Sequence, residues 1–125
     1  MSDARRILIV DDEESMRLLL GRIVATLPDV EVTLAGSCDE AVQLAGSRAY
    51  DLILLDLLMP GIGGIEVLKT IRTASANRKT PVLIVSVMAD PDTMIVCRSL
   101  GISDYIVKPI DRAAVLAAVN AQLAR

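Results

Sequence analysis

Residues 7–12 read ILIVDD, four apolar residues followed directly by two aspartates. A similar pattern returns at residues 52–56, LILLD, and further unbroken apolar runs occupy residues 82–85 and 105–107. Short unbroken runs rich in β-branched residues and leucine are typical of strands that are buried on both faces of a parallel sheet. Residues 30–34 alternate apolar and polar side chains, which predicts an edge strand with one wetter face. The sequence thus predicts five strands.

Two of the segments between and after these runs have a clear helical pattern. Apolar residues recur at intervals of three and four between positions 16 and 27, which predicts an amphipathic helix. Its buried stripe is predicted to be Met16, Leu19, Leu20, Ile23, Val24 and Leu27. A helix is also predicted over residues 111–124, with a core stripe of Leu116, Val119 and Leu123. Its other side carries alanines in place of charges, at Ala114, Ala118 and Ala121.

Capping residues mark the ends of two further helices. Ser37 and Glu40 have the spacing of a capping box, which predicts a helix start at that point. Asp90 followed by Pro91 combines an N-cap with a proline at the first helical position. Gly101 lies where a helix that begins at Pro91 would end in a left-handed residue.

A helix over residues 64–73 completes a strict alternation of strands and helices. This alternation predicts one α/β domain over residues 1–125, with right-handed crossovers that place helices on both faces of the sheet. The simplest such architecture is the flavodoxin-like, doubly wound (βα)5 fold, whose parallel five-stranded sheet has the order 2-1-3-4-5. Its functional crevice lies at the carboxyl ends of the first and third strands.

The composition argues against several functional classes. The chain has 13 basic and 16 acidic residues, a net charge of −3 and no Lys/Arg cluster, so we expect no direct binding to nucleic acid. The apolar runs stay well below the roughly 18 residues that span a bilayer, so we expect a cytoplasmic protein without a membrane segment. Histidine is absent, which removes the usual general base and the usual zinc ligand.

Three carboxylates are expected to meet at the crevice, from Asp11, Asp12 and Asp56. Carboxylates in such proximity repel one another, so one takes up a proton unless a cation neutralises the cluster. Oxygen ligands without His or Cys favour a hard ion, and a site with few protein oxygens and room for water suits Mg²⁺ better than Ca²⁺. We therefore predict a Mg²⁺ or Mn²⁺ site.

Ser86 and Lys108 follow the runs at 82–85 and 105–107, so both side chains are expected to face the same crevice. Phosphoryl transfer needs positioning and charge stabilisation, which a metal ion, an ammonium and a hydroxyl provide without a general base. An ionised aspartate, with a reference pKa of about 3.9, is a competent nucleophile at neutral pH. Each of these residues alone suits a cap, a turn or the surface, but their joint placement predicts phosphoaspartate formation on Asp56.

Four separated motifs are similar, in order and spacing, to those of the response-regulator receiver family. They are residues 7–12 (ILIVDD), residues 54–61 (LLDLLMPG), Ser86 and residues 105–109 (YIVKP). The resemblance covers essentially the whole chain, and it implies a receiver of two-component and phosphorelay signalling with the chemotaxis-type receiver fold. It also implies that Asp56 is the phosphoacceptor.

The resemblance further assigns roles around the metal. It implies that the side chains of Asp12 and Asp56 and the backbone carbonyl of Leu58 bind Mg²⁺ directly, and that Asp11 acts through metal-bound water. A second set of implied roles concerns the phosphoryl group and the switch. Lys108 would contact the phosphoryl oxygens, Ser86 would move to bond them, and Tyr105 would change its rotamer with Ser86. The bond from Lys108 to Pro109 resembles the family's cis-proline turn.

The partners also follow from the resemblance. A sensor histidine kinase or a histidine phosphotransfer protein would supply the phosphoryl group. The chain would act as a signalling switch that catalyses its own phosphorylation and slow dephosphorylation, not as a classical enzyme. A separate observation bears on the binding surface: the helix at 111–124 is nearly apolar all round. We therefore expect the face made by the helix after Asp90, the strand at 105–107 and the helix at 111–124 to bind an unknown downstream protein or, as a homodimer, a second copy of this chain.

Other functional classes fit these residues less well. A phosphohydrolase with an aspartyl-phosphate intermediate would carry a second Asp two positions after the nucleophile, where this chain has Leu58. A flavin-binding protein would need a phosphate-cradling loop after the first strand, where the sequence is Asp-Asp-Glu-Glu. The alternative is a phosphate-independent interaction module on the receiver fold, against which the full set of polar residues at the strand ends argues.

Two positions depart from the family's usual pattern. Val87 follows Ser86 where the family commonly has a small residue, which predicts a narrower approach to the phosphoryl group. Leu58 offers no polar side chain to orient a hydrolytic water. Both departures predict a longer-lived acyl phosphate.

Overall fold

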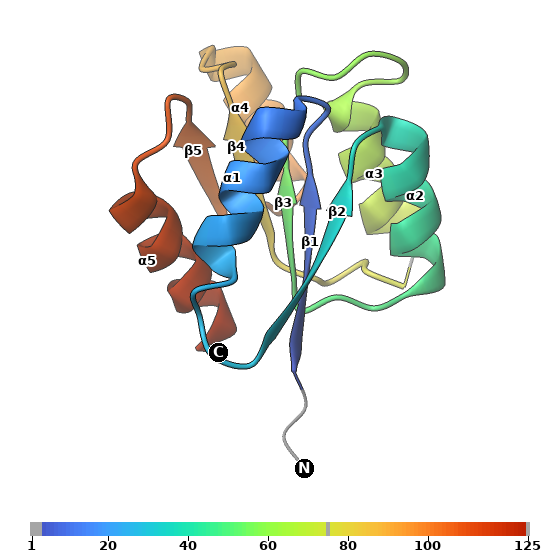
Figure 1. The fold of residues 1–125 in the computed structure, drawn as a ribbon. Coiled ribbons are helices and arrows are strands. Elements are labelled where there is room, and N and C mark those ends of the chain that lie inside the picture. The colour runs from blue at the N-terminus through green and yellow to red at the C-terminus, as the bar shows by residue number, and fades with distance from the viewer. Residues whose placement is uncertain (1–3, 75, 125) are drawn as a thin grey trace.

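The fold is seen in a computed structural model that describes residues 4–74 and 76–124 (Figure 1). These residues contain strands and helices in strict alternation. The strands are β1 (Arg5–Val10), β2 (Val30–Ala35), β3 (Leu52–Leu55), β4 (Val82–Ser86) and β5 (Asp104–Val107). The helices are α1 (Glu14–Val24), α2 (Cys38–Ser47), α3 (Gly64–Ala74), α4 (Pro91–Ser99) and α5 (Arg112–Leu123).

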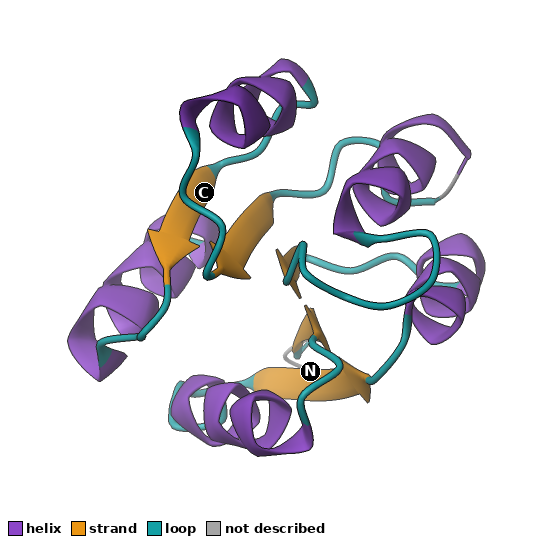
Figure 2. Ribbon diagram, turned by 90° about the horizontal axis from the view of Figure 1, so that it is seen from above, coloured by secondary structure: helices purple, strands orange, loops and turns teal. Residues whose placement is uncertain are grey.

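All pairs of neighbouring strands are parallel, and the sheet has the order β2-β1-β3-β4-β5. The predicted flavodoxin-like (βα)5 fold and its strand order are therefore confirmed. Helices α1 and α5 cover one face of the sheet, and α2, α3 and α4 cover the other (Figure 2). Alternate residues of β1 enter different cores: Ile7 and Ile9 pack towards α1 and α5, while Leu8 and Val10 pack towards α2 and α3.

The predicted caps form as side-chain hydrogen bonds. The backbone N–H of Glu40 donates to Ser37 Oγ at 3.1 Å, and the backbone N–H of Thr93 donates to Asp90 Oδ2 at 3.0 Å. These bonds satisfy N–H groups that have no acceptor inside the helix. Gly101 ends the α4 segment with a φ of 74°, in the left-handed region predicted for it.

Three predictions about burial are wrong in detail. β5 was expected to be buried on both faces, but it lies at the sheet edge and Val107 is 41% exposed. Leu19 was placed in the buried stripe of the first helix, but it is 43% exposed, because the core there accommodates only a narrow stripe. In α5, the fully buried Val115 was left out of the predicted core stripe, and Leu116, which was included, packs half-buried against the core.

Two other residues, Leu27 and Ala118, also differ from their predicted positions in these helices. Leu27, predicted to belong to the first helix, lies beyond its end at Val24 and packs partly buried against the core. Ala118, predicted to lie on the outer side of α5, is half-buried against the core as well. Among residues 4–74 and 76–124, none of the helices combines the length and apolar character needed to cross a bilayer.

Candidate functional site

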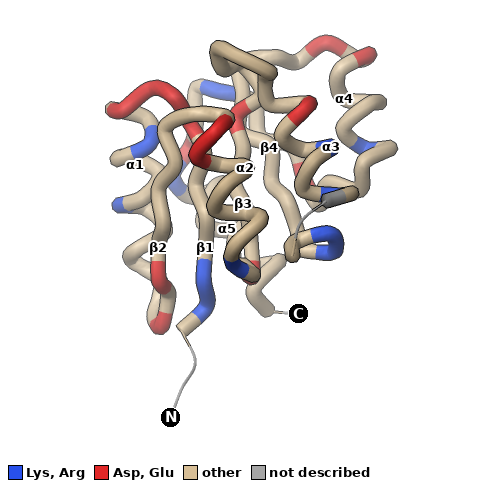
Figure 3. Tube along the Cα trace, turned by 90° about the vertical axis from the view of Figure 1, so that its right-hand side faces the viewer, with Lys and Arg blue, Asp and Glu red and all other residues tan. Residues whose placement is uncertain are grey.

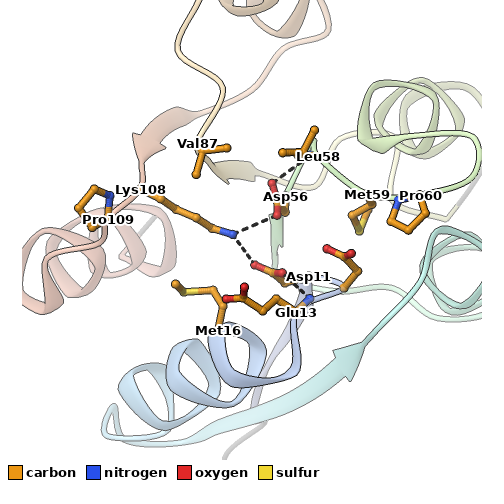
Figure 4. Close-up of a pocket in the computed structure, with 11 residues that line it drawn as sticks. Asp11, Glu13, Met16, Asp56, Leu58, Met59, Pro60, Val87, Lys108 and Pro109 are labelled. Atoms are coloured by element: carbon orange, nitrogen blue, oxygen red, sulfur yellow. Dashed lines mark hydrogen bonds and ion pairs between the residues drawn. The ribbon is translucent and has the colours of Figure 1, made fainter.

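A cleft of about 830 Å³ opens at the carboxyl ends of the strands, between the loops that follow β1, β3, β4 and β5 (Figure 4). Its walls are formed by Asp11, Asp12, Glu13, Met16, Asp56, Leu58, Met59, Pro60, Val87, Lys108 and Pro109. The register of the sheet explains the meeting of the two acidic segments. Val10 pairs with Leu55, so the residues that follow them, Asp11 and Asp56, leave their strands side by side.

Lys108 bridges two of the aspartates from the opposite wall of the cleft. Its Nζ donates to Asp11 Oδ2 at 2.8 Å and to Asp56 Oδ2 at 3.0 Å (Figure 4). Asp11 is 1% exposed and Asp56 is 4% exposed, so both carboxylates need partners of this kind. Because these bonds join charged groups away from solvent, they hold the ammonium over the space between β1 and β3.

The three predicted carboxylates lie together. One oxygen each from Asp11, Asp12 and Asp56 falls within 4.8 Å of the others, and Asp12 is the exposed member of the group. With the Lys108 ammonium the cluster keeps a formal charge of −2, from three carboxylates and one cation. Acidic residues also begin α1 and α2 at this end of the sheet, so the field there favours a cation (Figure 3). An all-oxygen donor set of this size fits a hard divalent ion such as Mg²⁺.

Burial and the ion pairs shift two pKa values in the cleft. Burial raises the pKa of Asp11, and the hydrogen bonds from Lys108 and from the Glu13 N–H only partly oppose that rise. Burial works against the charge on Lys108, but the hydrogen bonds to Asp11 and Asp56 and the negative charges of these two groups together raise its pKa. Lys108 is therefore a cation at neutral pH, and a further cation in the cleft would favour the ionised form of Asp11.

The loop after β3 orients the Asp56 carboxylate. The backbone N–H of Leu58 donates to Asp56 Oδ1 at 3.1 Å, which occupies the oxygen that Lys108 leaves free. The start of α3 packs directly on this loop. A Cβ on Gly64 would lie 2.4 Å from the Leu57 Cα and 2.5 Å from the Asp56 carbonyl oxygen, so only glycine fits there. The close approach of α3 fixes the backbone on which Asp56 stands.

The two predicted switch residues lie beside the cleft and share a contact. Ser86 is fully buried and is not part of the cleft wall; its Oγ accepts a hydrogen bond from the Met88 N–H at 3.2 Å. The hydroxyl of Tyr105 donates to the backbone carbonyl of Met88. The main chain of Met88 thus links Ser86 and Tyr105, and the peptide between Lys108 and Pro109 is cis, as the resemblance implied.

Two residues at this end of the sheet were missed by sequence reasoning. Met88 contributes only backbone atoms, and its side chain carries no signal of that role. Arg17, one turn into α1, donates from Nη1 to the backbone carbonyl of Asp11 at 2.8 Å. A basic residue so close to two aspartates in the sequence was the available signal, although it does not reveal the acceptor.

The site and the fold together define a class of protein. An acidic cluster at the switch point of a doubly wound sheet, bridged by a lysine from the loop after β5, is the arrangement of a receiver-type signalling domain. The sequence model of the response regulator receiver domain matches residues 7–120. The chain therefore belongs to the response regulator receiver domain family, whose members are signalling switches.

Individual proteins show the same relationship. The chain is 36% identical over 121 residues to the response regulator ArlR of Staphylococcus saprophyticus, covering 96% of this chain and 53% of that one. It is 38% identical over 120 residues to the transcriptional regulatory protein ResD of Bacillus subtilis, covering 96% and 48%. It thus spans about half the length of these curated relatives.

A solved receiver domain agrees closely in structure. The receiver domain of the sensor histidine kinase PA1611 from Pseudomonas aeruginosa has a TM-score of 0.86 and 25% identity to this chain. The match covers 98% of this chain and 99% of that one. That protein was solved with a magnesium ion coordinated in its active site cleft.

Proposed function

We propose that residues 1–125 act as a phosphorelay receiver domain in which Asp56 accepts a phosphoryl group from a phosphohistidine. The donor would be a sensor histidine kinase or a histidine phosphotransfer protein. The observation that carries the proposal is the double contact of Lys108 Nζ with Asp11 and Asp56, inside a cluster of three carboxylates. This arrangement places a nucleophile beside a cation that can stabilise the charge of a transferring group.

The residues fit a bound Mg²⁺ or Mn²⁺. In the proposal, Asp12, Asp56 and the backbone carbonyl of Leu58 hold the ion, and Asp11 acts through metal-bound water. Support comes from the oxygen donors within 4.8 Å of one another and from the magnesium ion in the PA1611 receiver domain. When bound, the ion would supply positive charge for the oxygens of the transferring group.

The chemistry then rests on a few side chains. A carboxylate oxygen of Asp56 forms the bond to phosphorus while the P–N bond of the phosphohistidine breaks, and its electron pair returns to the imidazole nitrogen. Lys108 lies beside the attacking carboxylate and would bind the phosphoryl oxygens, which stabilises their charge during transfer. The N–H of Leu58 holds Asp56 Oδ1 and keeps the carboxylate oriented. Slow hydrolysis would remove the modification: a water oxygen bonds to phosphorus while the bond from phosphorus to the Asp56 oxygen breaks, which releases inorganic phosphate and restores the carboxylate.

The signal would leave the site through the loop after β4. Movement of the Ser86 Oγ towards the phosphoryl oxygens would disturb the hydrogen bond that it now accepts from the Met88 N–H, and Tyr105 donates to the carbonyl of the same residue. Phosphorylation would thereby shift the population of α4 and β5 conformations. Apolar side chains exposed on these elements, Ile95 at 62% and Val107 at 41%, support a protein-binding surface there. A downstream protein or a second copy of this chain would bind it.

The decisive experiment is intact mass after incubation with acetyl phosphate or phosphoramidate and Mg²⁺. The wild-type protein is expected to gain one phosphoryl group, and Asp56→Asn or added chelator is expected to abolish the gain. Asp51→Asn is the matched control, because Asp51 lies at the opposite end of β3, where it accepts from the Arg6 N–H. Failure of the wild type to gain mass would favour the phosphate-independent interaction module, whereas an equal gain in Asp56→Asn would overturn Asp56 as the acceptor.

A further inference from the structure

Arg17 makes an unusual contact at the edge of the acidic cluster. It lies in the first turns of α1, and its guanidinium turns back to the end of β1, where Nη1 donates to the backbone carbonyl of Asp11 at 2.8 Å. Among the described residues, no carboxylate forms an ion pair with Arg17. The guanidinium therefore binds a peptide group next to three carboxylates without pairing with any of them.

The carbonyl that Arg17 binds belongs to the peptide between Asp11 and Asp12. A peptide is planar, so fixing its oxygen also fixes the N–H and the starting direction of the next residue. The other groups of Asp11 are already held. Its N–H donates to the Ala35 carbonyl at 3.1 Å, and its carboxylate accepts from the Glu13 N–H at 2.9 Å and from Lys108. By holding the carbonyl of this peptide, Arg17 also fixes the backbone direction of Asp12, whose side chain is exposed.

The residue that follows β2 is a glycine, which leaves space for the guanidinium of Arg17. Gly36 follows β2, and a Cβ built on it would lie 2.8 Å from Arg17 Nη1 and 3.2 Å from Arg17 Cζ. Gly36 is not in the left-handed region, so its backbone does not itself require glycine. The absence of a side chain at position 36 is explained by the space that the Arg17 guanidinium occupies.

We propose that Arg17 is a positioning residue of the metal site, which orients the Asp11–Asp12 peptide so that both carboxylates face a divalent cation. The inference rests on the proposed Mg²⁺-dependent function and adds a residue outside the predicted ligand set. Residues that orient metal ligands typically change affinity by 10-fold or more when they are removed, although they never touch the ion. Gly36 supports this role of Arg17, because the absence of a side chain at position 36 leaves space for the guanidinium.

The direction in which Arg17→Met changes Mg²⁺ affinity distinguishes a positioning role from an effect of charge alone. Arg17 is a cation near a cation site, so if its charge alone mattered, Arg17→Met would relieve repulsion and tighten Mg²⁺ binding. If it positions the ligands, Arg17→Met weakens Mg²⁺ binding, by about 10-fold. Isothermal titration calorimetry of the unphosphorylated protein with Mg²⁺ measures this directly, and urea unfolding in chelator shows that each variant is folded.

Two further variants complete the test. Arg22→Met removes the same charge from the same helix at an exposed residue, and it is expected to leave Mg²⁺ affinity unchanged or slightly tighter. Gly36→Ala keeps the Arg17 charge but pushes the guanidinium away from Asp11, so it is expected to weaken binding. Because both changes act through one contact, Gly36→Ala should add nothing in the Arg17→Met background.

The outcomes distinguish the two proposals. Wild-type protein that binds Mg²⁺ together with Arg17→Met protein that binds it equally or more tightly would overturn the positioning role alone. Additive losses in the double variant would also overturn it, because the two residues would then act separately. Wild-type protein that binds no Mg²⁺ would overturn the proposed function, and the positioning role with it.

Discussion

Asp12→Asn is expected to stabilise the metal-free protein while weakening its response to Mg²⁺. The side chain keeps its size but loses its charge, and the charge is what Asp12 contributes to the repulsive cluster with Asp11 and Asp56. A residue that serves a metal site carries this cost whenever the metal is absent. The substitution therefore changes stability in opposite directions with and without the ion.

The structure sets the size of the effect. At 4.8 Å, the outer limit of the separations in the cluster, two unit charges repel by about 3.5 kcal/mol at an effective dielectric constant of about 20 and by about 0.9 kcal/mol in bulk water. Asp12 faces two carboxylates, but the positive charge of Lys108 offsets one of them. Because Asp12 is exposed, its repulsion is close to the value for bulk water. We therefore expect a gain of about 1 kcal/mol in the free energy of unfolding.

Urea unfolding in chelator and in saturating Mg²⁺ measures both halves of the prediction. At about 100 times its dissociation constant, a ligand adds about 2.7 kcal/mol to the free energy of unfolding, and Asp12→Asn should show a smaller increment at the same concentration. Asp92→Asn is the control, because Asp92 is exposed in the first turn of α4. Its charge is favourable there, so its loss should be neutral or slightly destabilising.

Two results would refute this reasoning. If Asp12→Asn destabilised the protein in chelator, the carboxylates would not repel as their separation implies. If Mg²⁺ stabilised Asp12→Asn as much as the wild type, Asp12 would not be a ligand.

Three further predictions follow from particular contacts. Val87→Ala is expected to speed the loss of phosphate, because Val87 lies in the cleft wall and is 54% exposed; unchanged or slower loss in a radiolabel chase would count against this. Burial raises the pKa of Tyr50 and Tyr105 above 10.0, so phenolate absorbance should appear only above that pH in the folded protein. Their contribution to stability is complete below pH 10.0 and is lost as pH rises through the folded-state values, so a transition at or below pH 10.0 would contradict the burial. Gly64→Ala should destabilise the protein by about 1–3 kcal/mol because its Cβ would meet backbone. Gly46→Ala, with nothing within 4 Å of its Cβ, should be neutral or stabilising, and equal urea midpoints for the two variants would show that Gly64 is not closely packed.

The features that sequence could predict are those with a local or periodic cause. Continuous apolar runs predict buried parallel strands, and the caps at Ser37 and Asp90 formed where side-chain spacing placed them. The meeting of Asp11 with Asp56 was also predictable, because parallel strands in a doubly wound sheet end at one edge. Each of these inferences needs only the residues of one element, or one rule about how elements connect.

Burial was harder to predict because it depends on neighbours that the sequence does not name. Residues 105–107 of β5 form an unbroken apolar run, as residues 82–85 of β4 do, but β4 lies between two strands and β5 has only one neighbour. Val107 is therefore half open to solvent, although its sequence context resembles that of a buried strand. In α1, helical period alone cannot say how wide a stripe the sheet will cover, and Leu19 falls outside it.

Contacts from side chains to backbone carbonyls were the hardest to predict, and there is a physical reason. A pairing such as Lys108 with Asp56 can be inferred from the sequence, because only carboxylate side chains form an ion pair with an ammonium. A backbone carbonyl is present at every residue, so the sequence does not show which carbonyl accepts a hydrogen bond from a guanidinium. Arg17 binds one such carbonyl, and Arg72 binds five, from two separate loops. The sequence therefore predicts the charged groups of this site, whereas the contacts that orient its backbone become visible only when the chain is folded.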